Sequence, residues 1–277
     1  MKRLFLAAAL FSATLSPSFA CGPDALGVSR ILAVGTLGGG AVGLKTYPRT
    51  LPLQPGEVVL TFDDGPMPGR TEKVLDALAA ECVKATFFMI GRNAAAAPAL
   101  AARVAREGHT IGYHSMTHPN MRGLSFDAAR ANIEEGFRAV DKAVWGVSRE
   151  EAPHSPFFRF PGFADTPQLD GWLASKDVVI FGADLWASDW EPESSDAELK
   201  LIFERLARSK GGIVLLHDIQ PRTVAMLPTF LKELKKRGYR IVHFVPGPGP
   251  LESRDAPPGW FSQTDRIIRS RKTAKAG

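Results

Sequence analysis

The chain has 277 residues, of which 45% are hydrophobic and 23% are charged, and its formal net charge is +5. This composition supports a full-sized hydrophobic core and excludes a globally disordered chain. The length is near the upper end for one domain and is typical of a single α/β barrel.

Residues 1–20 have the pattern of a secretory signal peptide. A basic start precedes an apolar run over 4–15, and small residues follow at Ser18 and Ala20. The run is too short for a membrane span, and no later segment is long and apolar enough to be one. We therefore expect cleavage after Ala20, export to the periplasm or the cell exterior, and no transmembrane span in the mature protein.

The chain has two cysteines, Cys21 and Cys82. In an exported protein an even number of cysteines favours a disulfide, so a Cys21–Cys82 bridge is one interpretation. The other is that Cys82, within a helical pattern, is a small buried apolar residue. Cys21 would also lead the mature chain, as in a lipoprotein. That hypothesis ranks second, because Ser18 stands where lipoprotein signals usually have an aliphatic residue.

An N-terminal extension over 21–55 is expected to end in a Gly-rich, loop-like lead that covers 35–57. Beyond it, short apolar runs that predict strands alternate with longer segments of helical period. The predicted strands are 58–62, 85–90, 110–114, 157–160, 178–183, 213–217 and 240–244. The predicted helices are 71–81, 94–107, 125–145, 166–175, 196–209 and 223–237.

The alternation predicts an α/β fold with a parallel sheet that is buried on both sides. Seven strands favour an incomplete or distorted (β/α)7 barrel over 56–245, with a flat, doubly wound sheet as the alternative. After Asp265 the chain has five basic residues and no acid: Arg266, Arg269, Arg271, Lys272 and Lys275. We expect a basic, flexible tail over 246–277 rather than a nucleic-acid site.

Polar residues gather where the predicted strands end. In α/β barrels the chemistry lies at the carboxyl ends of the strands, so these side chains are predicted to share one face. The residues concerned are Asp63, Asp64, His114, His118, Arg159, Asp184, Asp189, His217 and Asp218.

The stretch "HSMTH" places His114 and His118 four residues apart. On a helix this spacing would put both imidazoles on one face. Pro119 argues against a helix, because a proline disfavours helical geometry in the residue before it. A strand end that turns into a loop can also bring the two together. Two histidines and one carboxylate form a recurrent catalytic metal set, and Asp64 is the candidate carboxylate.

The motifs "TFDDGP", "HSMTH", "RFPG", "SDW" and "LLH" follow one another in order along the chain. Over residues 56–245 they resemble a polysaccharide deacetylase of the NodB-homology type, carbohydrate esterase family 4. The resemblance implies a NodB-like barrel and a divalent metal. Zn²⁺ is the preferred ion, with Co²⁺, Ni²⁺ or Mn²⁺ as alternatives.

The resemblance also implies a role for each matching residue. Asp63 resembles the catalytic base, His217 the general acid, and the set Asp64, His114 and His118 the metal ligands. Arg159 resembles the arginine that orients the base, and Asp189 the carboxylate that tunes the acid. The substrate-binding residues implied are Gly162, whose N–H would stabilise the oxyanion, and Trp190 and Leu215, which would wall the acetyl groove.

Two positions depart from the family pattern. The arginine motif usually continues Pro-Tyr-Gly, whereas this chain has "RFPGF", so the oxyanion donor is assigned to Gly162. An aspartate usually stands three residues before Asp189, where this chain has Trp186. Trp186 either adds a sugar-stacking surface or is a core tryptophan.

The predicted function is removal of N-acetyl groups from an N-acetylglucosamine-type glycan, such as peptidoglycan or chitin oligosaccharide. The predicted partner is therefore an acetylated polysaccharide or oligosaccharide. One alternative is an O-acetyl esterase on xylan or another glycan, and another is a non-catalytic glycan-binding module. A small-molecule amidohydrolase is disfavoured, since those barrels usually carry His-x-His on the first strand. The sugar, its chain length and the oligomeric state stay open.

Overall fold

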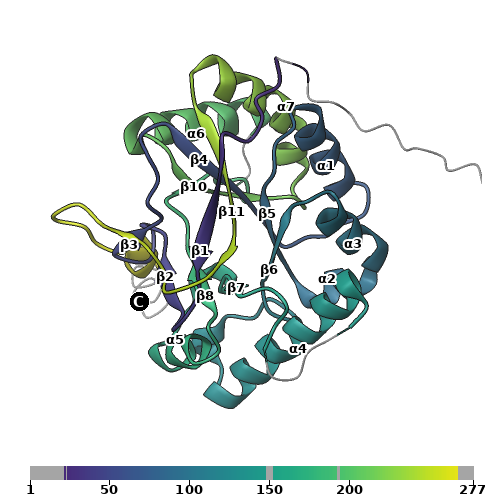
Figure 1. Cartoon of the computed structure of the whole chain (residues 1–277), viewed down its shortest axis with the longest axis vertical. Helices are drawn as coiled ribbons and strands as arrows, with labels where there is room; N and C mark the ends of the chain where they lie inside the picture. The colour runs from purple at the N-terminus through teal and green to yellow at the C-terminus, as the bar shows by residue number, and fades with distance from the viewer. Residues whose placement is uncertain (1–21, 23, 148–151, 192–193, 268–277) are drawn as a thin grey trace, which may run out of the picture.

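The computed structural model describes residues 22, 24–147, 152–191 and 194–267 (Figure 1). Its sheet is surrounded by helices, with β1 and β11 side by side across the centre of the view. The predicted signal peptide and the extreme basic end of the tail lie outside the described residues. Among the described residues, no helix combines the length and apolar composition that a membrane span requires.

The barrel strands pair in parallel in chain order, with β10 on the other side of β4. They are β4 (Glu57–Asp63), β5 (Thr86–Met89), β6 (Thr110–Tyr113), β7 (Phe157–Phe158), β8 (Val179–Phe181), β9 (Leu185–Trp186) and β10 (Gly212–His217). In the described part of the chain no ladder joins β8 to β9. The prediction of an incomplete or distorted barrel is confirmed, and β9 is a strand that the sequence did not indicate.

The helices cover the outside of this sheet (Figure 1). They are α1 (Thr71–Ala80), α2 (Gly91–Ala96), α3 (Pro98–Arg106), α4 (Phe126–Trp145), α5 (Pro167–Ala174), α6 (Ser195–Ser209) and α7 (Pro221–Lys236), with 3-10 turns η1 (Met121–Gly123) and η2 (Pro161–Phe163). Local sequence sets the ends of α4. Ser125 accepts a hydrogen bond from the Ala128 N–H, and Gly146 ends the helix at φ 76°.

The single helix predicted over 94–107 is wrong. The structure divides it at Ala97, which has φ −134° and ψ 58°, into α2 and α3. Pro98 causes the break, because proline has no N–H to donate and disfavours helical geometry in the preceding residue. At the first position of α3 the same proline is well tolerated.

The prediction of a loop-like lead is also wrong. The N-terminal segment contains β1 (Arg30–Gly35), β2 (Gly40–Val42) and β3 (Arg49–Thr50). β1 pairs with β11 (Arg240–Gly247), and β2 pairs with β8, whose edge is available because the barrel does not close there. The predicted boundary between 55 and 56 therefore crosses one continuous sheet. β2 and β3 have only three and two residues, too few to show a pattern, and β1 depends on a partner at the other end of the chain.

The predicted flexible tail packs against the fold as far as it is described. β11 continues to Gly247, and β12 (Arg254–Asp255) pairs antiparallel with β3. Further on, the Trp260 indole N–H donates to the Leu44 carbonyl, and Thr264 is buried. Composition alone did not indicate this, since the anchoring contacts come from partners some 200 residues earlier.

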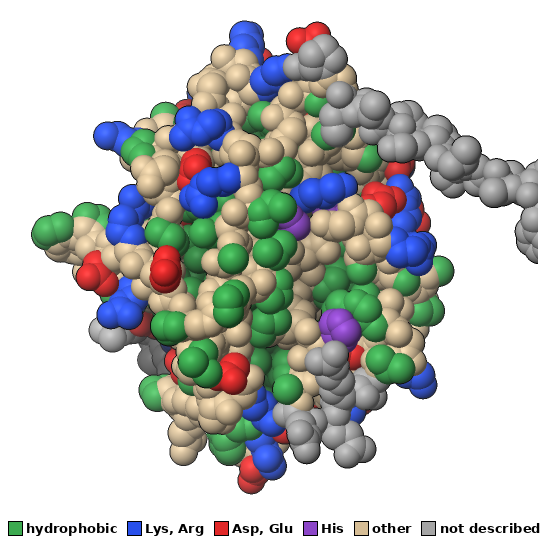
Figure 2. Space-filling view, viewed as in Figure 1, with side chains coloured by type: hydrophobic (Ala, Val, Ile, Leu, Met, Phe, Trp, Pro, Cys, Tyr) green, Lys and Arg blue, Asp and Glu red, His purple; other side chains and the backbone are tan. Residues whose placement is uncertain are grey.

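Aromatic side chains fill the inside of the barrel. Phe181 and Phe244 stack with ring centroids 4.5 Å apart, and Phe157 meets both rings edge-on. The strands' other face packs on the helices. The outer surface differs: on the face shown in Figure 2, Lys and Arg side chains are interspersed with Asp and Glu around a central strip of hydrophobic side chains. The apolar interior confines the polar groups of the barrel to its ends.

His243 is a satisfied core histidine, as its place inside the last strand suggests. Its Nε2 lies 2.9 Å from the Thr110 hydroxyl, and Thr110 donates its only proton to the Phe244 carbonyl. The imidazole must therefore be the donor to Thr110. Burial, together with the charge of Lys84, lowers the pKa of His243 to about 4.

Acid should destabilise the fold through His243. In the unfolded chain its pKa returns to about 6.5, so between about pH 6.5 and 4 the unfolded state binds more protons. The free energy of unfolding should fall as the pH falls through this window, by about 2 kcal/mol at pH 5 from this group. His243→Gln keeps a donor but cannot titrate. Urea unfolding at pH 7 and pH 5 with a chelator present should show a smaller pH effect in the variant. An equal effect in both proteins would contradict the assignment.

Candidate active site

Asp64, His114 and His118 converge at the carboxyl end of the barrel. The Nε2 atoms of His114 and His118 lie 3.5 Å and 3.4 Å from the same oxygen, Oδ1 of Asp64. One ligand atom from each of the three residues lies within 4.8 Å of the others. The three predicted ligands are therefore brought together.

The backbone explains how neighbouring acids reach different places. Asp63 is the last residue of β4, and its side chain points into the barrel toward Arg159. Asp64 adopts φ 76°, which turns its carboxylate toward the histidines. His118 also has a positive φ of 60°, and its N–H donates to the Ser115 hydroxyl. The "HSMTH" stretch is thus a strand end followed by a turn, in agreement with Pro119.

The protonation of His114 suits a metal ligand. Its Nδ1 lies 2.7 Å from the Arg159 carbonyl, which can only accept, so the proton is on Nδ1 and the Nε2 lone pair faces Asp64. Burial lowers the pKa of His114 well below its usual value and keeps the ring neutral. Oδ1 of Asp64 is buried without a hydrogen-bond partner. A buried anionic oxygen beside an imidazole lone pair fits a divalent cation.

The second carboxylate, Asp63, forms a buried ion pair. Arg159 is fully buried, and its Nη1 lies 2.6 Å from Oδ1 of Asp63 and 2.8 Å from the Thr61 hydroxyl. The other guanidinium N–H groups donate to the carbonyls of Phe181 and Gly182. Burial raises the pKa of Asp63 to about 6, although Arg159 and His217 oppose that rise. At neutral pH Asp63 is therefore ionised, and its carboxylate can accept a proton as a weak base.

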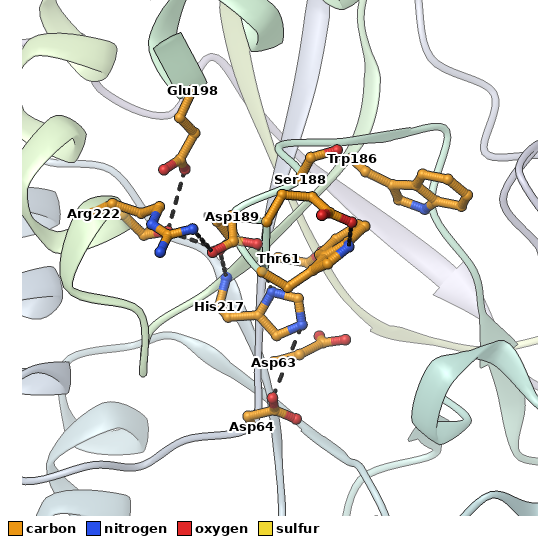
Figure 3. A network of polar contacts seen from close by, with 12 residues as sticks. Thr61, Asp63, Asp64, Trp186, Ser188, Asp189, Glu198, His217 and Arg222 are labelled. Carbon is orange, nitrogen blue, oxygen red and sulfur yellow. Dashed lines mark hydrogen bonds and ion pairs between the residues drawn. The ribbon is translucent and has the colours of Figure 1, made fainter. Parts of the chain in front are cut away.

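His217 ends β10 and lies between Asp189 and Asp64 (Figure 3). Its Nδ1 is 2.8 Å from Oδ1 of Asp189, and its backbone N–H donates to Oδ2 of the same carboxylate. Burial alone would lower the pKa of His217. The charge and hydrogen bond of Asp189, with the charges of Asp64 and Asp63, outweigh burial and raise it to about 9. His217 is therefore a protonated donor at neutral pH.

Two residues that the sequence reasoning missed support Asp189. Thr223 donates to Oδ2 of Asp189 over 2.7 Å, and Glu198 Oε1 lies 3.3 Å from the same hydroxyl. Burial raises the pKa of Glu198 to about 7, and the charge of Asp189 adds to the effect. A signal was present in the sequence: Glu198 lies four residues before Ile202, on the apolar side of the predicted helix 196–209.

Asp63, Asp64, His114, His118 and His217 border one cavity of about 490 Å³. The predicted substrate-binding residues Gly162, Trp190 and Leu215 all line it, whereas Arg159 and Asp189 are buried behind the lining. Trp186 also lines the cavity and is partly buried, packed on the cluster of Phe163, Ala183 and Leu215. The Lys45 ammonium group lies 5.0 Å from its ring centroid, and the rings of Phe163 and Trp190 also contact it.

Other predicted residues lie elsewhere. Asp184 accepts hydrogen bonds from the Leu44 and Ile213 N–H groups and the Thr50 hydroxyl, and it lines a separate, smaller cavity. Asp218 is buried and accepts from the Thr71 hydroxyl. The predicted Cys21–Cys82 pairing stays a prediction, because Cys21 lies outside the described residues.

The fold and this site together define an α/β-barrel protein with the ligand geometry of metal-dependent hydrolases. Residues 51–165 match the profile of the polysaccharide deacetylase family. The chain is 32% identical over 197 residues to a peptidoglycan-N-acetylglucosamine deacetylase of Bacillus cereus, covering 69% of this chain and 68% of that protein. It is also 32% identical over 211 residues to a chitooligosaccharide deacetylase of Sinorhizobium fredii, covering 72% and 94%. The chain belongs to the polysaccharide deacetylase family.

A solved structure supports the same placement. The peptidoglycan deacetylase of Bdellovibrio bacteriovorus superposes with a TM-score of 0.69 at 33% identity, over 78% of this chain. The matched region spans 58% of that protein. The NodB-like fold predicted from the motifs is therefore confirmed.

Replacement of Arg159 by Met should destabilise the protein by about 3–5 kcal/mol, because it leaves Asp63 buried without a counter-charge. Urea unfolding of the two proteins measures the loss. Arg103→Met, which removes surface ion pairs with Asp76 and Glu107, is the matched control and should cost less than about 1 kcal/mol. Adding Asp63→Asn to Arg159→Met should recover part of the loss. A double variant no more stable than Arg159→Met would contradict the explanation.

Proposed function

We propose that this protein is a metal-dependent deacetylase that hydrolyses N-acetyl groups of an N-acetylglucosamine-type glycan, such as peptidoglycan or chitin oligosaccharide. The observation that carries the proposal is the convergence of five side chains on one cavity: Asp63, Asp64, His114, His118 and His217. The relatives named as peptidoglycan and chitooligosaccharide deacetylases support this substrate class.

Asp64, His114 and His118 would hold the metal, and Zn²⁺ is the ion that two imidazoles and one carboxylate favour. When bound, the ion supplies a Lewis acid that polarises the acetyl carbonyl and lowers the pKa of a water molecule. The Arg159 carbonyl keeps the His114 proton on Nδ1, so that Nε2 stays available as a ligand atom.

Asp63 would be the general base. Its Oδ1 accepts a hydrogen bond from Arg159. Its Oδ2 lies 3.8 Å from Nε2 of His114, so this oxygen faces the proposed metal ligands. A carboxylate with a pKa of about 6 is ionised at neutral pH and can accept a proton from water. Arg159 thereby aims the base as well as pairing with its charge.

His217 would be the general acid. The Nδ1–H donates a hydrogen bond to Asp189, which leaves Nε2–H directed toward the cavity, 4.0 Å from Oδ2 of Asp64. An amide nitrogen is a poor leaving group until it is protonated, and His217 can supply that proton. The Gly162 N–H is proposed as the oxyanion donor. Trp190 and Leu215 are proposed to wall the acetyl group.

The two alternative functions would use the same side chains, either on an O-acetyl ester or for glycan binding alone. An O-acetyl esterase would need the same metal set and base, so only substrates can separate it from an N-deacetylase. A non-catalytic glycan-binding module has no need of a positioned base and acid. Acetate release from N-acetylglucosamine oligomers, peptidoglycan and acetylated xylan by the metal-loaded protein is the deciding assay. No release from the first two would overturn the proposal.

Export is part of the proposal. The signal pattern over 1–20 and the substrate class are the support for a periplasmic or secreted protein cleaved after Ala20. In that case Cys21 would be the first residue of the mature chain, either bridged to Cys82, unbridged or lipidated.

The metal set gives the first functional prediction. The protein should bind one divalent ion, and a chelator should abolish acetate release. Asp64→Asn and His118→Ala should each weaken zinc binding by more than the roughly 10- to 100-fold that loss of an outer-shell partner costs. Calorimetric titration with zinc measures this, with His154→Ala as the control histidine outside the site. Unchanged zinc affinity in both ligand variants would exclude the proposed metal set.

Loss of the proposed acid and loss of the proposed base should affect the two kinds of substrate differently. Asp63→Asn should lower the rate on the order of 10²- to 10⁴-fold on both an N-acetylglucosamine oligomer and an aryl acetate, because both need water activation. His217→Ala should act far more strongly on the oligomer, since a phenolate leaves without protonation. Acetate release by metal-checked variants measures both effects. Equal losses on the two substrates for His217→Ala would remove His217 from the acid role.

A further inference from the structure

The C-terminal segment 260–267 borders the same cavity as the metal ligands. Thr264 and Ile267 line this cavity together with Asp64, Trp186 and Trp190. Thr264 is buried, whereas Ile267 and Trp190 are 37% and 42% exposed. Large apolar side chains that remain exposed beside a catalytic cavity are candidates for ligand contact.

The segment is held in place on two sides. On one side, the Trp260 indole donates to the Leu44 carbonyl, and Thr264 donates through its N–H and its hydroxyl to the Lys45 carbonyl. On the other side, Asp265 pairs with Arg122 over 3.0 Å, just beyond the metal-ligand turn. The segment therefore bridges Lys45, whose ammonium group lies beside Trp186, and Arg122, which follows His118.

Lys45 links this segment to the aromatic wall. Its ammonium group donates to Gln263 and lies 5.0 Å from the ring centroid of Trp186. Phe163 lies on the Trp186 ring in a parallel orientation, and Trp190 meets it edge-on. Contacts of this kind fix the ring, so the wall is formed before a ligand arrives.

The cavity is larger than the reacting group needs. An acetamide group has four non-hydrogen atoms, which at roughly 30 Å³ per water-sized atom fill on the order of 100 Å³. The cavity measures about 490 Å³. The remaining space has apolar walls with a few polar groups, which matches a sugar ring with its C–H faces and hydroxyl edge.

We propose that residues 260–267, with Trp186, form a subsite for the sugar next to the one that loses its acetyl group. The proposal rests on the proposed deacetylase function and adds a binding element to it. The occupant is a neighbouring pyranose of an oligosaccharide, because the subsite is continuous with the cavity that the proposed metal ligands line and combines the apolar Trp186 and Ile267 with the polar Thr264.

Ile267→Ser tests the subsite in the full-length, metal-loaded protein. The KM for an N-acetylglucosamine oligomer should rise on the order of three- to tenfold relative to that for an aryl acetate, which reaches only the metal end. The kcat should change little, because the contact is made equally in the ground and transition states. Ile31→Ser is the matched control: Ile31 is 65% exposed on β1 and does not line the cavity.

Asp265→Asn provides a second test that leaves the cavity lining intact. Loss of the Arg122 contact should loosen the segment and raise the oligomer KM in the same direction. Asp255→Asn, which removes an exposed pair with Arg49, is its control. If wild type is active and Ile267→Ser behaves as Ile31→Ser does, the subsite is excluded and the deacetylase function stands. If wild type releases no acetate from any N-acetyl glycan, the proposed function itself fails.

Discussion

The buried ion pair between Arg159 and Asp63 is the constraint on which the site depends. A carboxylate that is 2% exposed would be strongly unfavourable without a counter-charge. Arg159 supplies that charge and uses its other donors on the carbonyls of Phe181 and Gly182, so the pair connects three strands. Its own carbonyl orients His114. One residue of the short β7 region therefore positions both the proposed base and a proposed metal ligand.

The incomplete barrel is part of how the cavity is built. In the residues that the structure describes, the sheet is open between β8 and β9. β9, which pairs with β10, and the loop after it place Trp186 and Trp190 in the cavity lining and Asp189 behind it. The N-terminal and C-terminal segments then fill the opening. β2 covers the edge of β8, and Thr264 packs beside it against Thr46. The aromatic wall thus depends on segments outside the predicted 56–245 region.

The sequence predicted the parts of the molecule that follow from local chemistry. The alternation of apolar strands and amphipathic helices located the barrel, and the motifs located Asp63, Asp64 and both histidines of the proposed metal set. It missed β1 and β2, since both strands depend on partners far along the chain, β11 and β8. Glu198 and Thr223 escaped for a similar reason. The position of Glu198 on the apolar side of its helix predicts burial, but its contact with Thr223, which donates to Asp189, joins two helices and a loop, which no local pattern encodes.

The pairing of β1 with β11 constrains the order in which the parts of the sheet can fold. Arg30 is aligned with Val242, and the Ser29 hydroxyl bonds to the Ile241 carbonyl across 212 residues. The first strand to be synthesised therefore has no partner until almost the last one exists. Contacts so distant in sequence slow folding, because a large loop must close before they form. The edge of the sheet that β1 forms is therefore completed only after β11 has been made.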